Sequence, residues 1–124
     1  MKKKILYIED DPDMAEIVSE IMQFEQYDVI TDSGKSMYKF LADEQIGLIL
    51  MDEGLSWCWG SNLCRELRAN EETAHIPIIM ISAVREIPDI AENCGANAYI
   101  RKPFEIYDVI DAINQHYPKT DLVE

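Results

Sequence analysis

Three short runs of almost purely apolar residues set the strongest limit on how this chain can fold. They are ILYI at 5–8, LILM at 48–51 and IPIIMI at 76–81. Uniformly apolar runs of this length are typical of strands that are covered on both faces, as in the centre of a parallel sheet. Two weaker runs, DVIT at 28–31 and AYI at 98–100, are expected nearer the edges of the same sheet.

Helical spacing of apolar residues fills the intervals between these runs and follows the last one. The helical segments lie at 14–22, 37–41, 63–67, 87–94 and 106–117. Pro12 suits the first turn of the first helix, and Gly95 is expected to stop the fourth. Strict alternation of five strands with five helices predicts right-handed crossovers and an open parallel sheet between two helical layers.

The composition excludes several classes of protein. The chain of 124 residues fits one domain, and 24 acidic against 11 basic residues give a net charge of -13, which disfavours nucleic acid as a partner. The start MKKKILYIED has too short an apolar part for a signal peptide, and no stretch is long enough to span a membrane. Cys58, Cys64 and Cys94 lack the spacing of a disulfide framework or a zinc site, so we expect a reducing cytoplasm.

Polar side chains follow the predicted strands, and parallel strands bring such side chains to one edge of the sheet. Glu9 and Asp10 follow the first strand, Asp52 the third and Ser82 the fourth, and Lys102 comes soon after the fifth. Clustered carboxylates repel one another unless a cation lies among them, and a donor set of oxygens favours Mg²⁺. A lysine and a hydroxyl nearby suit a phosphoryl group, so Asp52 is predicted to be a nucleophile that forms an aspartyl phosphate.

These strand ends resemble those of the receiver domain of two-component response regulators. The resemblance rests on YIEDDPDM, on LILMDEGL with Gly60, on IIMISA and on GANAYIRKPF, in that order along essentially the whole chain. It implies one flavodoxin-like, doubly wound (βα)5 domain over residues 1–124, with five parallel strands in the order 2-1-3-4-5. We expect no output domain after it, and no enzymatic activity beyond self-phosphorylation from small donors and slow autodephosphorylation.

By this resemblance Asp52 would accept a phosphoryl group from a histidine kinase or a phosphotransfer protein. Asp10 and Asp52 would bind Mg²⁺ directly, together with the backbone carbonyl of Gly54, and Glu9 would hold the ion through water. The net charge and the lack of a membrane-spanning stretch lead us to expect no nucleic acid or membrane partner, and the downstream target would be another protein.

The resemblance also implies how a phosphoryl group would be bound and sensed. Ser82, Ala83 and Lys102 would bind its oxygens. Tyr99 would turn inward with Ser82 as a switch, and core packing is the alternative role for its ring. Lys102 and Pro103 would be joined by a cis peptide bond. The surface of the fourth helix, the fifth strand and the fifth helix would change, and a homodimer, if one forms, would use this surface.

The chain departs from the family in the segment that follows Asp52. The family usually has proline four residues after the acceptor, whereas this chain has Ser56 and then the unusual WCW. Trp57 and Trp59 are expected to cap the third helix and to pack, and a partner surface or a lid over the acceptor is the alternative.

Two positions bear on the lifetime of the phosphoryl group. Gly54 and Val84 stand where polar side chains of related domains can orient the water that hydrolyses it. Neither residue can do so. We therefore expect a long-lived phosphoryl group.

Three other functions are considered. A phosphatase of the haloacid dehalogenase type would need its nucleophile after the first strand, where Asp11 and Asp13 come too late and lack the following threonine. A degenerate receiver would bind partners without phosphorylation, which Ser56, Gly54 and the short fourth helix allow. A flavodoxin-like electron carrier is disfavoured, because the acidic EDDPD would repel its phosphate. Asp11 is instead expected to cap the first helix.

Overall fold

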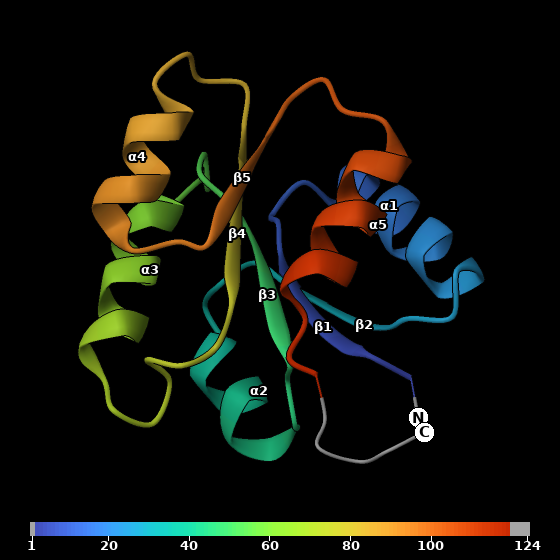
Figure 1. Ribbon diagram of the computed structural model, residues 1–124, viewed down its shortest axis with the longest axis horizontal. Coiled ribbons are helices and arrows are strands. Elements are labelled where there is room, and N and C mark those ends of the chain that lie inside the picture. The colour runs from blue at the N-terminus through green and yellow to red at the C-terminus, as the bar shows by residue number, and fades with distance from the viewer. Residues whose placement is uncertain (1, 120–124) are drawn as a thin grey trace.

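The computed structural model describes residues 2–119 and contains a five-stranded sheet in the order β2-β1-β3-β4-β5 (Figure 1). The strands are β1 (Lys4–Ile8), β2 (Asp28–Asp32), β3 (Leu48–Asp52), β4 (Ile78–Ser82) and β5 (Ala98–Arg101). All neighbouring strands pair in parallel, and the two least apolar strands, β2 and β5, form the edges. The predicted strand order is confirmed.

A helix follows each strand, which confirms the predicted alternation. The helices are α1 (Pro12–Phe24), α2 (Met37–Asp43), α3 (Gly60–Ala69), α4 (Ile87–Cys94) and α5 (Ile106–His116). Asp11 caps α1 as expected, because its side chain accepts hydrogen bonds from the amides of Asp13 at 3.0 Å and Met14 at 3.4 Å. Gly95 ends α4 with a φ of 86°, a left-handed conformation that glycine adopts without strain. None of the helices described between residues 2 and 119 is long and apolar enough to cross a membrane.

The sheet is buried on both faces, because each strand sends alternate side chains to opposite sides. In β1, Ile5 and Tyr7 belong to the core beneath α1 and α5, whereas Leu6 and Ile8 belong to the core beneath α2, α3 and α4. Figure 1 shows these two helical layers on either side of the sheet. The apolar runs of the sequence therefore correspond to strands that are covered by helices on both faces of the sheet.

Strand boundaries differ by one or two residues from those expected, and the differences in β3 and β4 bear on the position of site residues. β4 begins at Ile78, two residues later than predicted, because Pro77 has no amide hydrogen for the ladder and only its carbonyl pairs, accepting from Ile49 at 2.9 Å. β3 and β4 each extend one residue further than predicted, so Asp52 and Ser82 are the last residues of their strands. Paired backbone therefore holds both of these side chains in place.

Candidate functional site

The ends of β1 and β3 and the segment after β5 bring three of the predicted site residues into contact. Lys102 Nζ lies 2.7 Å from Asp52 Oδ1 and 3.6 Å from Glu9 Oε1. Asp52 and Glu9 are almost fully buried, with exposed fractions of 4% and 6%. The peptide bond between Lys102 and Pro103 is cis. One ammonium group therefore lies beside two buried carboxylates, and we call these three residues the acceptor cluster.

Burial and charge shift the pKa of all three groups. Burial raises the pKa of Asp52 above its usual value, and the hydrogen bond and charge of Lys102 offset only part of this effect. Burial also raises the pKa of Glu9, and the negative charge of Asp52 raises it further. Burial acts to lower the pKa of Lys102, but the hydrogen bond and charge of Asp52 outweigh burial and raise that pKa. The single cation thus balances the two carboxylates only in part.

In the metal-free protein we expect the stabilising contribution of Asp52 and Glu9 to fall as the pH rises above about 4, the usual pKa of these groups in an unfolded chain. A carboxyl group whose pKa is raised by folding stabilises the folded state below its unfolded pKa, and this contribution is lost as the pH rises through the folded pKa. Urea unfolding with a chelator at several pH values measures the change. The decline should be smaller for Asp52→Asn, because the amide does not titrate, and equal declines in the two proteins would contradict this explanation.

A tyrosine inside β1 contacts the same cluster. Tyr7 is fully buried, and its hydroxyl donates a hydrogen bond to Glu9 Oε1 at 3.4 Å. Burial, followed by the charges of Glu9 and Asp52, raises the pKa of this phenol, so Tyr7 stays a neutral donor. The sequence analysis missed this residue. Strand periodicity could have found it, because alternate residues share a face and Tyr7 stands two positions before Glu9.

Asp10 contacts the β3–α3 loop, which we define as residues 53–59. Asp10 Oδ2 accepts a hydrogen bond from the backbone amide of Ser56. Hydrogen bonding by Ser56 holds the pKa of Asp10 below its usual value. Ser56 is therefore a second contact of the site that the sequence analysis did not predict.

The two tryptophans of the β3–α3 loop differ in their surroundings. Trp57 Nε1 donates a hydrogen bond to the carbonyl of Ser33 at 2.9 Å, and its ring lies against Gly34, where a Cβ would come within 3.1 Å of Cζ2. Trp59 directly precedes α3, but its side chain makes no capping hydrogen bond and is 56% exposed. Trp59 therefore stands before α3 without capping it through its side chain, and Trp57 is 41% exposed although it contacts the segment after β2, so the expected capping and packing of both residues are not observed.

Contacts of the segment after β4 involve Ser82 and the fifth strand. Ser82 is buried, and its Oγ accepts a hydrogen bond from the amide of Val84 at 3.0 Å. Arg101 Nη1 donates to the carbonyls of Val84 and Arg85, each at 3.4 Å, and its guanidinium lies 6.0 Å from the centre of the Tyr99 ring. Tyr99 is 41% exposed, so core packing, the alternative role for its ring, is not observed.

A third buried carboxylate, Glu53, lies directly after Asp52 but was not a predicted site residue. The amide of Ser61 donates to Glu53 Oε1 at 2.6 Å, and the Ser61 hydroxyl donates to Oε2 at 2.9 Å. The amide of Gly60 also donates to the backbone carbonyl of Glu53 at 2.9 Å. These bonds fasten the start of α3 to the end of β3. Strand or helix periodicity gives no signal for such a contact between two elements.

The donors at this edge of the sheet suit Mg²⁺. Besides burial, the charge of Asp10 raises the pKa of Asp52, as expected of neighbouring carboxylates. Gly54 and Ala83 are exposed, and a Cβ at Gly54 would come within 3.9 Å of Asp52 Oδ2. Within residues 2–119 no three acidic, histidine or cysteine side chains form a complete ligand set. Mg²⁺ does not require one, since it keeps several waters and commonly takes one or two carboxylates from a protein.

The family model for the response regulator receiver domain matches residues 5–114, which include every residue of the acceptor cluster. The chain belongs to this family. This match confirms the family inferred from the strand-end motifs. Carboxylates, a hydroxyl and a lysine where the strands end are in keeping with a receiver domain.

Curated relatives agree with this assignment. The receiver domain is 32% identical to the DNA-binding dual master transcriptional regulator RpaA of Synechocystis sp., over 97% of this chain and 51% of that protein. It is 33% identical to the response regulator ArlR of Staphylococcus saprophyticus, over 98% of this chain and 56% of that protein. The chain therefore spans about half the length of the curated relatives that it matches.

Solved structures share the fold. The receiver domain protein of Methanospirillum hungatei, described as CheY-like, superposes with a TM-score of 0.82 at 25% identity and covers 93% of each chain. The receiver domain of the sensor histidine kinase PA1611 from Pseudomonas aeruginosa superposes with a TM-score of 0.83 at 24% identity, over 94% of this chain and 98% of that one. These similarities confirm the flavodoxin-like architecture.

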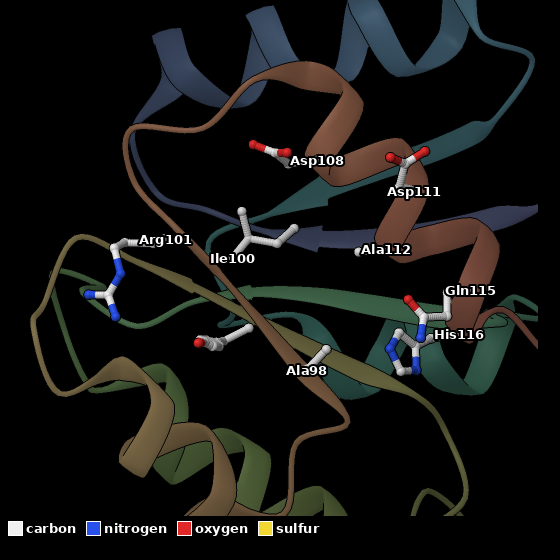
Figure 2. A pocket seen from close by; sticks show the side chains of 9 residues that line it. Ala98, Ile100, Arg101, Asp108, Asp111, Ala112, Gln115 and His116 are labelled. Carbon is white, nitrogen blue, oxygen red and sulfur yellow. The ribbon is translucent and has the colours of Figure 1, made fainter.

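A separate hollow lies at the free edge of β5, against α5 (Figure 2). It has a volume of about 450 Å³, and no member of the acceptor cluster lines it. Arg101 contributes a positive charge from β5, whereas Asp108 and Asp111 contribute negative charges from α5. This edge therefore presents both signs of charge beside Tyr99.

Proposed function

We propose that this receiver domain accepts a phosphoryl group on Asp52 from a histidine kinase or a histidine-containing phosphotransfer protein. The observation that carries the proposal is the contact of 2.7 Å between Asp52 Oδ1 and Lys102 Nζ at a buried strand end. A cation beside a nucleophilic carboxylate is suited to bind the oxygens of an incoming phosphoryl group.

In the proposed transfer, a carboxylate oxygen of Asp52 forms the new P–O bond while the P–N bond to the donor histidine breaks. The electron pair of the broken bond returns to the imidazole, which takes up a proton. Lys102 would move its hydrogen bond from Asp52 to the phosphoryl oxygens. Glu9, whose carboxylate is 3.6 Å from the same ammonium, would keep that side chain in the cluster.

The proposal includes Mg²⁺ as the cofactor. Asp10, Asp52 and the backbone carbonyl of Gly54 would bind the ion, and Glu9 would hold one of its waters. When bound, the ion would supply positive charge between the carboxylates and the phosphoryl oxygens. The similar receiver domain of PA1611 was solved with a magnesium ion coordinated in its active-site cleft, which supports this assignment.

Ser82, Ala83 and Tyr99 would convert phosphorylation into a change of surface. The Ser82 hydroxyl could donate to a phosphoryl oxygen on Asp52, and the backbone of Ala83 would bind another. The hydrogen bond from the Val84 amide to Ser82 Oγ would carry the segment after β4 along with this movement. The exposed ring of Tyr99 would then turn inward, and the surface formed by α4, β5 and α5 would change.

This surface is also where we propose homodimer formation. The hollow in Figure 2 is lined by Arg101 of β5 and by Asp108 and Asp111 of α5, so two copies related by a two-fold axis could pair opposite charges twice. Light scattering before and after phosphorylation measures the mass in solution. A monomer in both states would contradict the dimer without affecting the assignment of Asp52.

An apolar groove beside Lys102 suits the protein that donates the phosphoryl group. The groove has a volume of about 440 Å³ and combines Met14, Ile17 and Ile21 of α1 with Phe104. Exposed apolar grooves commonly take up the apolar face of a partner helix. Ile17, which is 56% exposed, should therefore matter for the donor protein but not for a small donor. In Ile17→Asp, transfer from a kinase should slow at least tenfold, whereas phosphorylation by acetyl phosphate should keep its rate; equal effects on both would contradict this role.

We further propose a signalling role without substrate turnover, in the cytoplasm, with no nucleic acid or membrane partner of this domain. The net charge of -13 would repel a phosphodiester backbone. RpaA is named as DNA-binding, but the present chain spans about half of that protein.

Intact mass after incubation with acetyl phosphate tests the proposed function. One phosphoryl group should be added in the presence of Mg²⁺, and none after the metal has been removed. A generic phosphate ester should not be hydrolysed repeatedly, because continued turnover would indicate a phosphatase. No added mass with Mg²⁺ would instead favour a receiver that binds its partners without phosphorylation.

The phosphoryl group, once formed, is expected to persist for minutes or longer. Gly54 has no side chain, and Val84, which is 39% exposed, has no polar atom that could orient a water toward the phosphorus. The decay of the added mass in purified protein with Mg²⁺ measures the lifetime. Val84→Gln should shorten it severalfold, and a half-life of seconds in the unchanged protein would contradict the expectation.

A further inference from the structure

The contact between Asp10 and Ser56 joins two loops that would share the metal ion. Asp10 lies two residues after the end of β1, and Ser56 lies in the middle of the β3–α3 loop, two residues after Gly54. The Ser56 amide donates its hydrogen bond to Oδ2 of Asp10. This bond therefore links a proposed ligand side chain to the loop that carries a proposed ligand carbonyl.

The loop around Ser56 is anchored on both sides, so the direction of its amide is fixed. Leu55 is 8% exposed and packs in the core beneath α2, α3 and α4. Gly54 and Trp59 form an antiparallel bridge across the loop. Trp57 donates to the carbonyl of Ser33 at 2.9 Å, which ties the loop to the segment after β2. The Ser56 amide that donates to Asp10 is therefore part of a loop held at several points.

Proline could not make this contact, because it has no backbone amide hydrogen. The family usually has proline at the place of Ser56, so proline is accepted there in related domains. The hydrogen bond to Asp10 consequently belongs to this chain and not to receivers with proline. Substitutions at this position can distinguish the amide of Ser56 from its hydroxyl. Alanine keeps the amide hydrogen and loses only the hydroxyl, whereas proline loses both.

We propose that the backbone amide of Ser56 positions Asp10 for binding of Mg²⁺, by holding Oδ2 and leaving Oδ1 free for the ion. This inference rests on the proposed metal site. Asp10 is only half-buried, so without the amide its side chain would have to be ordered when the ion binds. Ordering one side chain on binding weakens affinity by about twofold to tenfold.

Two variants at one position test the proposal. Mg²⁺ is titrated into the unchanged protein, Ser56→Ala and Ser56→Pro, and binding is followed by the fluorescence of Trp57 and Trp59. Ser56→Ala should stay within twofold of the unchanged protein, whereas Ser56→Pro should bind Mg²⁺ about twofold to tenfold more weakly. Equal affinities for the two variants, or tighter binding by Ser56→Pro, would overturn the role of the amide. Thermal unfolding without Mg²⁺ establishes that each variant is folded.

A second measurement is independent of the folding of Ser56→Pro. In the unchanged protein, hydrogen exchange at the Ser56 amide should be slow, and in Asp10→Ala it should be at least tenfold faster. Equal exchange in the two proteins would overturn the proposal. If the unchanged protein shows no response to Mg²⁺, the proposed metal site fails and the inference fails with it. If the unchanged protein binds Mg²⁺ and the two Ser56 variants bind it with equal affinity, the inference fails but the proposed metal site stands.

Discussion

Asp52→Asn is expected to abolish the addition of a phosphoryl group from acetyl phosphate and Mg²⁺. The amide has nearly the same shape as the carboxylate but lacks the anionic oxygen that would form the P–O bond. Lys102, 2.7 Å from Asp52 Oδ1 in the unchanged protein, keeps Glu9 as a neighbour, so the variant should fold. Intact mass should show no phosphorylated species at a time when the unchanged protein is fully modified.

Glu53→Gln is the matched control for this variant. Glu53 is the next residue along the chain and is as deeply buried as Asp52, with 5% against 4% of its surface exposed. Its carboxylate is engaged by Ser61 rather than by Lys102. The control should therefore still gain one phosphoryl group. If Asp52→Asn were still modified and Glu53→Gln were not, Glu53 and not Asp52 would be the acceptor.

Gly60→Ala is expected to destabilise the fold by about 3 kcal/mol, through overpacking where α3 meets β3. A Cβ at this position would come within 2.1 Å of the backbone carbonyl oxygen of Asp52 and 2.9 Å of Met51 Cγ. Backbone cannot rotate away as a flexible side chain can, so α3 must shift relative to the strand. That shift would also disturb the hydrogen bond that the Gly60 amide donates to the Glu53 carbonyl. Urea unfolding measures the loss.

Gly54→Ala is the matched control, because it adds the same methyl group within the β3–α3 loop, a few residues before Gly60. A Cβ at Gly54 would meet only Asp52 Oδ2, at 3.9 Å, which is ordinary contact distance. The control should therefore change stability by less than about 1 kcal/mol. Equal losses of stability in the two variants would show that adding any side chain in this part of the chain destabilises the fold. Acceptance of a phosphoryl group should slow in Gly60→Ala, since Asp52 lies at the displaced strand end.

The predicted fold follows from features that act over a few residues. Runs such as Ile5 to Ile8 are almost purely apolar, and this pattern is typical of a strand covered on both faces. The strand boundaries were less predictable, because Pro77 looks apolar in the sequence yet cannot donate to the ladder. Tyr99 shows the same limit, since an aromatic residue in an edge strand can face either solvent or core.

The sequence by itself determined the doubly wound sheet and the edge at which Glu9, Asp10, Asp52, Ser82 and Lys102 are gathered, because parallel strands place all their carboxyl ends together. Only the tertiary structure decided which groups touch within that edge. The Ser56 amide on Asp10, the Tyr7 hydroxyl on Glu9 and the Ser61 donors on Glu53 join separate segments or depend on side-chain direction. Such hydrogen bonds depend on the course of loops and on where single amides point, and residue types and periodicity do not encode either.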